Sequence, residues 1–261
     1  MLKKEKGVTK AELIIFYKKL KPEIIGKFKD KQFKEKMIEW IECAEFDIKA
    51  AKEIKKSYTD KESKDPFLIA LSVFHLQQAV EKAAKVFSYI IVKQESSAEK
   101  TIRDSAHTTV LALVSALLSR KEILPQRYIT LLTDLEDNLK KPFVKEGILS
   151  SDDFDFAVIS KENIIKIISE FNAEVPKSKN ILEISSESDE SISNITIKLT
   201  QVLPLALITF SHWSFTRYPN GRIKPSNYNN LGITHCLDEL ISKIEDIVNN
   251  LNLAFKGTVT S

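Results

Sequence analysis

Residues 74–85, FHLQQAVEKAAK, decide the fold of this chain. On a helix, Gln77, Glu81 and Lys85 follow one another at intervals of four residues, and Gln78 and Lys82 form a second row beside them. The remaining arc of the helix is apolar and can pack against a core through Phe74, Ala79 or Val80, Ala83 and Phe87. The segment therefore predicts a helix that combines a buried face with a compact polar cluster.

This polar cluster has two interpretations. In the first, it is a solvated helix face held by an ion pair between Glu81 and Lys85, which is the ordinary role of such residues. In the second, it is a polar site that binds a ligand or a partner. Residue types alone favour the first.

Composition predicts a mostly α-helical protein without a strong electrostatic field. The chain has 261 residues, with only six glycines and eight prolines, which favours long helices over many tightly turned strands. Its 39 basic and 36 acidic side chains leave a net charge of +3, so any anion site has to be local.

The same sequence predicts a cytoplasmic protein that needs no metal and no cofactor. Cys43 and Cys236 lack paired ligand spacing, which fits a reducing compartment, and both are expected to pack as small apolar residues. His75 and His235 are expected to be buried or half-buried histidines of amphipathic helices. No export signal is visible in residues 1–7, and the apolar run Val202–Phe210 is too short to span a membrane.

Apolar periodicity and capping residues predict the helices along the chain. Pro22 is expected to reset the chain after the first helix, and Glu174–Ser193, which is polar and acidic, is expected to be a mobile loop or a linker. Asp65 is expected to cap one helix, with Pro66 at its first position, and Ser105 to cap the next, which carries Val110 to Leu118. The predicted helices are Lys10–Leu20, Lys31–Lys55, Pro66–Val92, the helix capped by Ser105, Pro125–Leu139, Lys161–Phe171 opened by Ser160, Ile195–Phe215 and Asn227–Leu253.

Four motifs in a fixed order resemble the HEPN family (higher eukaryote and prokaryote nucleotide-binding). They are Trp40-x3-Ala44-x2-Asp47-x2-Ala50-Ala51, the segment from Phe74 to Lys85, His107 at the head of an aliphatic helix, and Arg217-Tyr218-Pro219-Asn220-Gly221. The resemblance covers Trp40–Leu118 and His212–Val248, somewhat under half of the chain.

The resemblance implies an all-α fold, an up-and-down bundle of four to five core helices. On this basis residues 31–120 and 195–255 form the bundle. Residues 1–30 form an accessory helix or hairpin, and residues 121–194 form a helical insertion that ends in the acidic loop. The family further implies a homodimer linked to prokaryotic defence or toxin–antitoxin systems, which acts as a metal-independent endoribonuclease or as a noncatalytic partner of a nucleotidyltransferase.

Catalysis by this family requires an arginine followed, after four to six residues, by a histidine. No arginine in the chain meets that rule. Arg103 and His107 come nearest, with three residues between them, and could supply the cation and the proton-transfer group of RNA cleavage. His107 can equally be a structural residue at a helix start, and Arg103 a solvated loop charge.

The main hypothesis is therefore a HEPN-like protein that binds nucleotide or RNA. In it, lysines and arginines contact phosphate and glutamines orient the base or a helix partner. The alternatives are an active endoribonuclease that uses Arg103 and His107, and an interaction protein without a small-molecule ligand. The predicted ligand residues are Gln77, Gln78, Lys82, Lys85, Arg217 and Arg222, and the predicted catalytic residues are Arg103 and His107.

Overall fold

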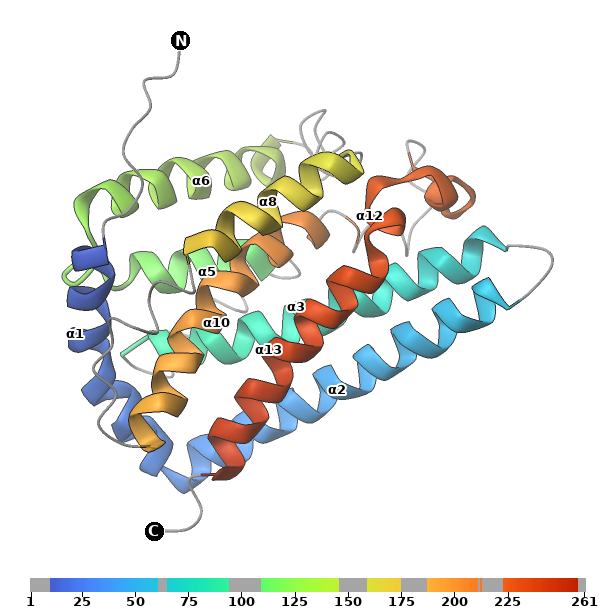
Figure 1. Ribbon diagram of the computed structural model, residues 1–261. Helices are drawn as coiled ribbons and strands as arrows, with labels where there is room; N and C mark the ends of the chain where they lie inside the picture. The colour runs from blue at the N-terminus through green and yellow to red at the C-terminus, as the bar shows by residue number, and fades with distance from the viewer. Residues whose placement is uncertain are drawn as a thin grey trace.

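The computed structural model describes residues 10–60, 65–93, 109–145, 159–174, 187–210, 212 and 223–257, and confirms the predicted all-α fold. Across these residues the regular structure is helical and no strand occurs (Figure 1). The helices are α1 (Lys10–Lys29), α2 (Lys31–Thr59), α3 (Pro66–Ile91), α5 (Thr109–Leu118), α6 (Gln126–Lys145), α8 (Lys161–Glu174), α10 (Glu187–Thr209), the 3-10 helix η1 (Pro225–Asn230), α12 (Gly232–His235) and α13 (Leu237–Gly257).

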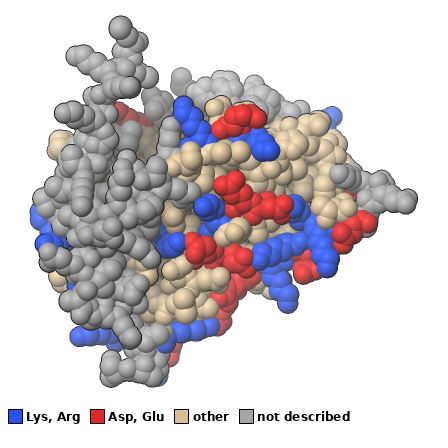
Figure 2. All heavy atoms as spheres, in the orientation of Figure 1, with Lys and Arg blue, Asp and Glu red and all other residues tan. Residues whose placement is uncertain are grey.

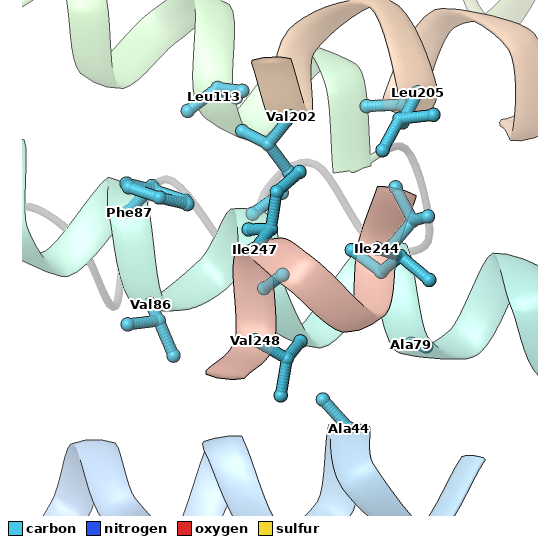
Figure 3. Close-up of a cluster of buried hydrophobic side chains, with 14 of the residues drawn as sticks. Ala44, Ala79, Val86, Phe87, Leu113, Val202, Leu205, Ile244, Ile247 and Val248 are labelled. Atoms are coloured by element: carbon cyan, nitrogen blue, oxygen red, sulfur yellow. The ribbon is translucent and has the colours of Figure 1, made fainter. Parts of the chain in front are cut away.

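Helix α3 lies at the centre of this arrangement. It runs antiparallel to α2, and α5, α10, α13 and η1 also pack against it. Asp65 caps its first turn by accepting a hydrogen bond from the Phe67 amide, and Pro66 occupies the first helical position, as the sequence predicts. Its apolar arc meets the neighbouring helices in the core shown in Figure 3, which includes Ala44, Ala79, Val86, Phe87, Leu113, Val202, Leu205, Ile244, Ile247 and Val248.

Two cations from other elements satisfy the carbonyls at the end of α3. An α-helix leaves its last four carbonyls without partners in the helix, and the last turn of α3 contains no basic residue. Lys27 of α1 donates to the carbonyls of Tyr89 (2.6 Å) and Ile90 (3.0 Å), and Arg120 donates to that of Ile91 (2.8 Å). Both cations also face the negative end of the helix dipole.

Arg120 is the largest fully buried side chain among the described residues, and its charge is matched. Its two terminal nitrogens each donate to an oxygen of Glu23 at 2.8 Å, and its Nε donates to Glu122 at 3.1 Å. A two-pronged guanidinium–carboxylate pair fixes orientation as well as charge. Helix α1 and the turn after α5 are thereby tied to the end of α3.

Several helix boundaries differ from the prediction; α6, for example, continues to Lys145 instead of ending at Leu139. Pro22 does not reset the chain but lies inside α1, where Leu20 and Ile24 on either side are both buried in the core and favour an unbroken helix. Residues 187–193 are not loop but begin α10, where acidic residues are stabilised by the positive end of the helix dipole. The last long helix begins at Leu237, because η1 and α12 precede it.

Gly232, at the start of α12, lies against the backbone that leads into α8. A Cβ atom at this position would overlap the carbonyl oxygen of Ile159 and lie 2.8 Å from the amide nitrogen of Lys161. Both obstacles are backbone atoms, so no side chain can rotate to make room. The contact between α12 and α8 therefore requires glycine.

We expect Gly232→Ala to destabilise the protein by about 1–3 kcal/mol, because the added methyl forces the two backbones apart. The matched control is Gly26→Ala in α1, where a Cβ would meet no atom within 4 Å. This control should stabilise the protein by up to about 1 kcal/mol, since alanine is the better helix former. Urea denaturation measures both, and equal stability of Gly232→Ala and the unmodified protein would contradict the contact.

Candidate functional site

The predicted ligand residues Gln77, Gln78, Lys82 and Lys85 come together on α3, where they form two neighbouring polar networks. The first consists of Asp47 on α2 with His75 and Lys82. The second consists of Gln77, Gln78, Glu81 and Lys85. Both networks lie on the part of α3 that runs beside α2.

In the first network, one carboxylate holds two side chains of α3. Asp47 Oδ1 lies 2.8 Å from His75 Nδ1, and Asp47 Oδ2 lies 2.5 Å from Lys82 Nζ. Seven residues separate His75 from Lys82, so they lie two turns apart on the same side of the helix. An ionised carboxylate can only accept, so the Nδ1 of His75 donates to Asp47.

The charge state of Asp47 follows from these bonds. Burial by itself would raise the pKa of Asp47, but the hydrogen bonds from His75 and Lys82, together with their positive charges, outweigh it and lower the pKa below its ordinary value. Asp47 is therefore ionised at neutral pH although it is only 6% exposed.

The second network is held by Glu81. Its carboxylate accepts from Lys85 at 2.6 Å and from Gln77 at 3.2 Å, while the amide of Gln78 bridges to Gln77 at 2.6 Å. The ammonium of Lys85 also lies 4.9 Å from the centre of the Trp40 ring, a cation–π distance. The positive charge of this network is thus matched by one carboxylate and one aromatic face.

These contacts correct the interpretation of the cluster as a solvated face. The ion pair between Glu81 and Lys85 is confirmed, but Glu81 is only 5% exposed and Gln77 only 1%. Asp47 and His75 belong to the cluster and were missed as site residues. The available signals were Asp47 in the motif that begins at Trp40, and the seven-residue spacing of His75 and Lys82.

A partly exposed row of side chains runs along α3, and we call it the α3 stripe; three of its members, Gln78, Lys82 and Lys85, also belong to the networks. Its residues follow in steps of four, three, four, four and three, which keeps them on one side of the helix. At the N-terminal end the row is apolar, with Phe67 61% exposed and Leu71 43% exposed. The α3 stripe consists of Phe67, Leu71, Phe74, Gln78, Lys82 and Lys85.

The other predicted site residues lie outside the described part of the chain. These are Arg103, His107, Arg217 and Arg222, so their place beside or away from the α3 stripe stays a prediction. Two smaller expectations are wrong: Cys43 and His235 are exposed, on the outer sides of α2 and α12. Cys236 is buried, as expected, and burial raises the pKa of its thiol.

His212 precedes the motif that begins at Arg217 in the sequence, and its side chain is fully buried. Its Nδ1 lies 2.9 Å from the hydroxyl of Tyr228 in η1, which is also buried. Burial lowers the pKa of His212 to about 3 and raises that of Tyr228. The pair is therefore neutral at physiological pH and fastens η1 to the core.

A surface pocket of about 470 Å³ opens between α2 and α13. Its lysines are mixed with carboxylates: Lys52 lies 2.5 Å from Glu245, and Lys55 pairs with Asp238. On the face in Figure 2, basic and acidic side chains alternate along this seam. The pocket thus lacks the concentrated positive charge that attracts nucleic acid.

Within the described residues, no cluster of three or more potential metal ligands occurs, and no helix is long and apolar enough to cross a membrane. Comparison with known proteins gave no match to a family model, a curated protein or a solved structure. The chemistry of the two networks is therefore the basis on which a function can be argued.

We expect Asp47→Asn to destabilise the protein by about 2–4 kcal/mol, because an amide cannot accept from both His75 and Lys82 and leaves a half-buried ammonium without its counter-charge. The control is Asp238→Asn, which removes the exposed partner of Lys55 and should cost less than about 1 kcal/mol. Denaturation curves at pH 7 compare the two. Equal losses would show that the first network contributes no more than a surface ion pair.

Acid should destabilise the protein through His212. The pKa of His212 is about 3 in the folded protein and 6.5 in the unfolded chain. Between these two pH values the unfolded state binds a proton at His212 that the folded state does not bind. The contribution of neutral His212 is complete above pH 6.5 and is lost at about 1.4 kcal/mol per pH unit as pH falls toward 3.

The corresponding variant is His212→Gln, whose neutral amide can still bond to Tyr228. Urea unfolding between pH 6.5 and 4.5 should show a shallower loss of stability for the variant than for the unmodified protein, by about 1.4 kcal/mol per pH unit. Asp47 is present in both proteins, so the small effect of its lowered pKa in this range cancels in the comparison. Parallel pH profiles would mean that His212 is protonated in the folded protein.

Proposed function

We propose that this protein is a noncatalytic, cytoplasmic, HEPN-like binding protein and that the α3 stripe is its contact surface. The observation that supports this most is the internal pairing of charge. Lys82 and Lys85 are bound at 2.5 and 2.6 Å by Asp47 and Glu81, and these carboxylates are almost fully buried. Such groups hold a surface in shape, whereas catalysis requires groups free to exchange protons with a substrate.

Exposed apolar side chains at one end of the α3 stripe also support a binding role. Phe67 and Leu71 lie one helical turn apart, and adjacent exposed apolar groups of this size are typical of surfaces that other molecules cover. They continue directly into Phe74 and the polar residues of the stripe. The surface therefore combines an apolar end with a fixed polar end.

The binding of nucleotide or RNA is the second candidate. It is favoured by the amide of Gln78 and by the ring of Trp40, which Lys85 of the same network contacts, since an amide can bond to a base edge and an aromatic ring can stack on a base. In this version Arg217 and Arg222 contact the phosphates. The resemblance adds a homodimer, a nucleotidyltransferase partner and a role in defence or toxin–antitoxin systems to the proposal, and it keeps Arg103 and His107 as the residues of the endoribonuclease alternative.

A cleavage assay in EDTA tests the noncatalytic assignment. We expect neither the unmodified protein nor an Arg103→Ala/His107→Ala variant to cleave a broad pool of RNA at low salt, because catalytic function is not part of the proposed surface. Circular dichroism confirms that the variant is folded. Cleavage by the unmodified protein that disappears in the folded variant would identify an endoribonuclease instead.

The same preparations test the second candidate with fluorescein-labelled single-stranded RNA. If a base stacks on Trp40, Trp40→Leu should weaken binding at least fivefold, since stacking contributes about 1–3 kcal/mol for each base. The matched control is Phe46→Leu, an exposed aromatic residue on the same helix. Equal affinities of the two variants would remove Trp40 from any RNA site.

A further inference from the structure

We infer that the α3 stripe is a docking surface for a single amphipathic helix of a different protein. This rests on the proposed function, in which the stripe is the contact surface, and adds the kind of partner. The partner helix would lay apolar side chains over Phe67 and Leu71, and uncharged polar side chains over Gln78, Lys82 and Lys85.

The spacing of the stripe selects a helix as the partner. Steps of three and four residues produce the ridge that helices use to pack against one another. From Phe67 to Lys85 the ridge spans 18 residues, or about 27 Å at 1.5 Å for each residue. A partner helix of about the same length covers it completely. The rest of α3 is already surrounded by α2, α5, α10, α13 and η1, so the stripe is the side that accepts another helix.

The charges of the stripe argue against an anionic ligand. Lys82 and Lys85 are each paired with a carboxylate, so the polar end of the stripe has no unmatched lysine charge to attract a phosphate. An anion placed there would also lie close to the carboxylates of Asp47 and Glu81, whose negative charges repel it. Uncharged donors and acceptors meet no such repulsion, and they can add hydrogen bonds while both ion pairs remain intact.

The order of residues argues against a second copy of this chain. In an antiparallel pair, Phe67 and Leu71 of one copy would lie on Lys82 and Lys85 of the other, so that apolar side chains cover ion pairs. In a parallel pair, Lys82 and Lys85 would meet the same lysines. A helix of different sequence can place apolar side chains on Phe67 and Leu71 and polar side chains on Lys82 and Lys85. It is therefore complementary to both ends of the stripe, which a second copy of the chain is not.

The test uses the full chain and a phage-displayed library of helical peptides of about 20 residues, in which the positions of one face are varied. Selected peptides are synthesised with fluorescein, and their dissociation constants are measured by anisotropy. We expect a selected face that is apolar at one end and uncharged but polar at the other. Leu71→Asp should weaken binding at least tenfold, and Phe67→Ser should do so independently, since each removes one of the apolar contacts at the exposed end of the stripe.

The controls are Ile165→Asp on α8 and Leu253→Asp on α13, which place the same charge on exposed apolar residues elsewhere. They should change the affinity less than twofold. Circular dichroism and urea unfolding confirm that all four variants are folded. Peptides that bind Leu71→Asp and Phe67→Ser as tightly as the unmodified protein would overturn the inference, because they occupy another surface.

Two further measurements separate this inference from the proposed function. Sedimentation that shows a dimer abolished by Leu71→Asp would replace the partner helix with a second copy. RNA binding that is weakened by Lys82→Gln and not by Leu71→Asp would replace it with an anionic ligand. Either result overturns the helix partner and keeps the stripe as the contact surface. If no stripe variant affects peptide binding, self-association or RNA binding, both proposals are wrong.

Discussion

The structure depends on burying α3 without leaving its backbone or its polar side chains unsatisfied. A helix surrounded by others cannot rely on water for its last carbonyls, and unpaired buried carbonyls are costly. Lys27 and Arg120 supply the missing donors from elements on either side of α3 in the sequence. The hydrogen bonds that end α3 therefore also determine where α1 and the turn after α5 lie, and Glu23 balances the charge that Arg120 brings.

The same constraint explains why the polar cluster consists of complete pairs. Beside a packed core, a lone carboxylate or ammonium would be strongly unfavourable, so Asp47 and Glu81 each carry a lysine and further hydrogen-bond donors. Buried ion pairs contribute little net stability compared with apolar packing, but they tolerate few alternative arrangements. The pairing of Asp47 with His75 and Lys82 fixes how α2 and α3 are aligned, and with it the position of the α3 stripe.

The sequence predicted what depends on neighbours along one helix. The apolar periodicity of α2 and α3, the Asp65–Pro66 start and the ion pair between Glu81 and Lys85 all follow from spacing, and the structure has each of them. It could not predict what depends on contacts between helices. The burial of Gln77 and Glu81 requires knowledge of how α2 lies on α3, and the role of Arg120 follows from residues about 30 and 97 positions away. The continuity of α1 through Pro22 is likewise decided by the core that holds Leu20 and Ile24.

The two ends of the α3 stripe differ in chemistry, and this difference limits what the surface can bind. The polar end is set by internal pairing, so its lysines offer hydrogen bonds and little free charge. At the apolar end, Phe67 and Leu71 follow the same periodicity as the buried residues of α3 but remain exposed. This pattern fits the proposal that another helix packs against this side of α3. A ligand chosen by charge would use only one end of this surface, and a ligand chosen by apolar contact would use only the other. A helix can satisfy both at once, because its side chains repeat with the spacing of the stripe itself.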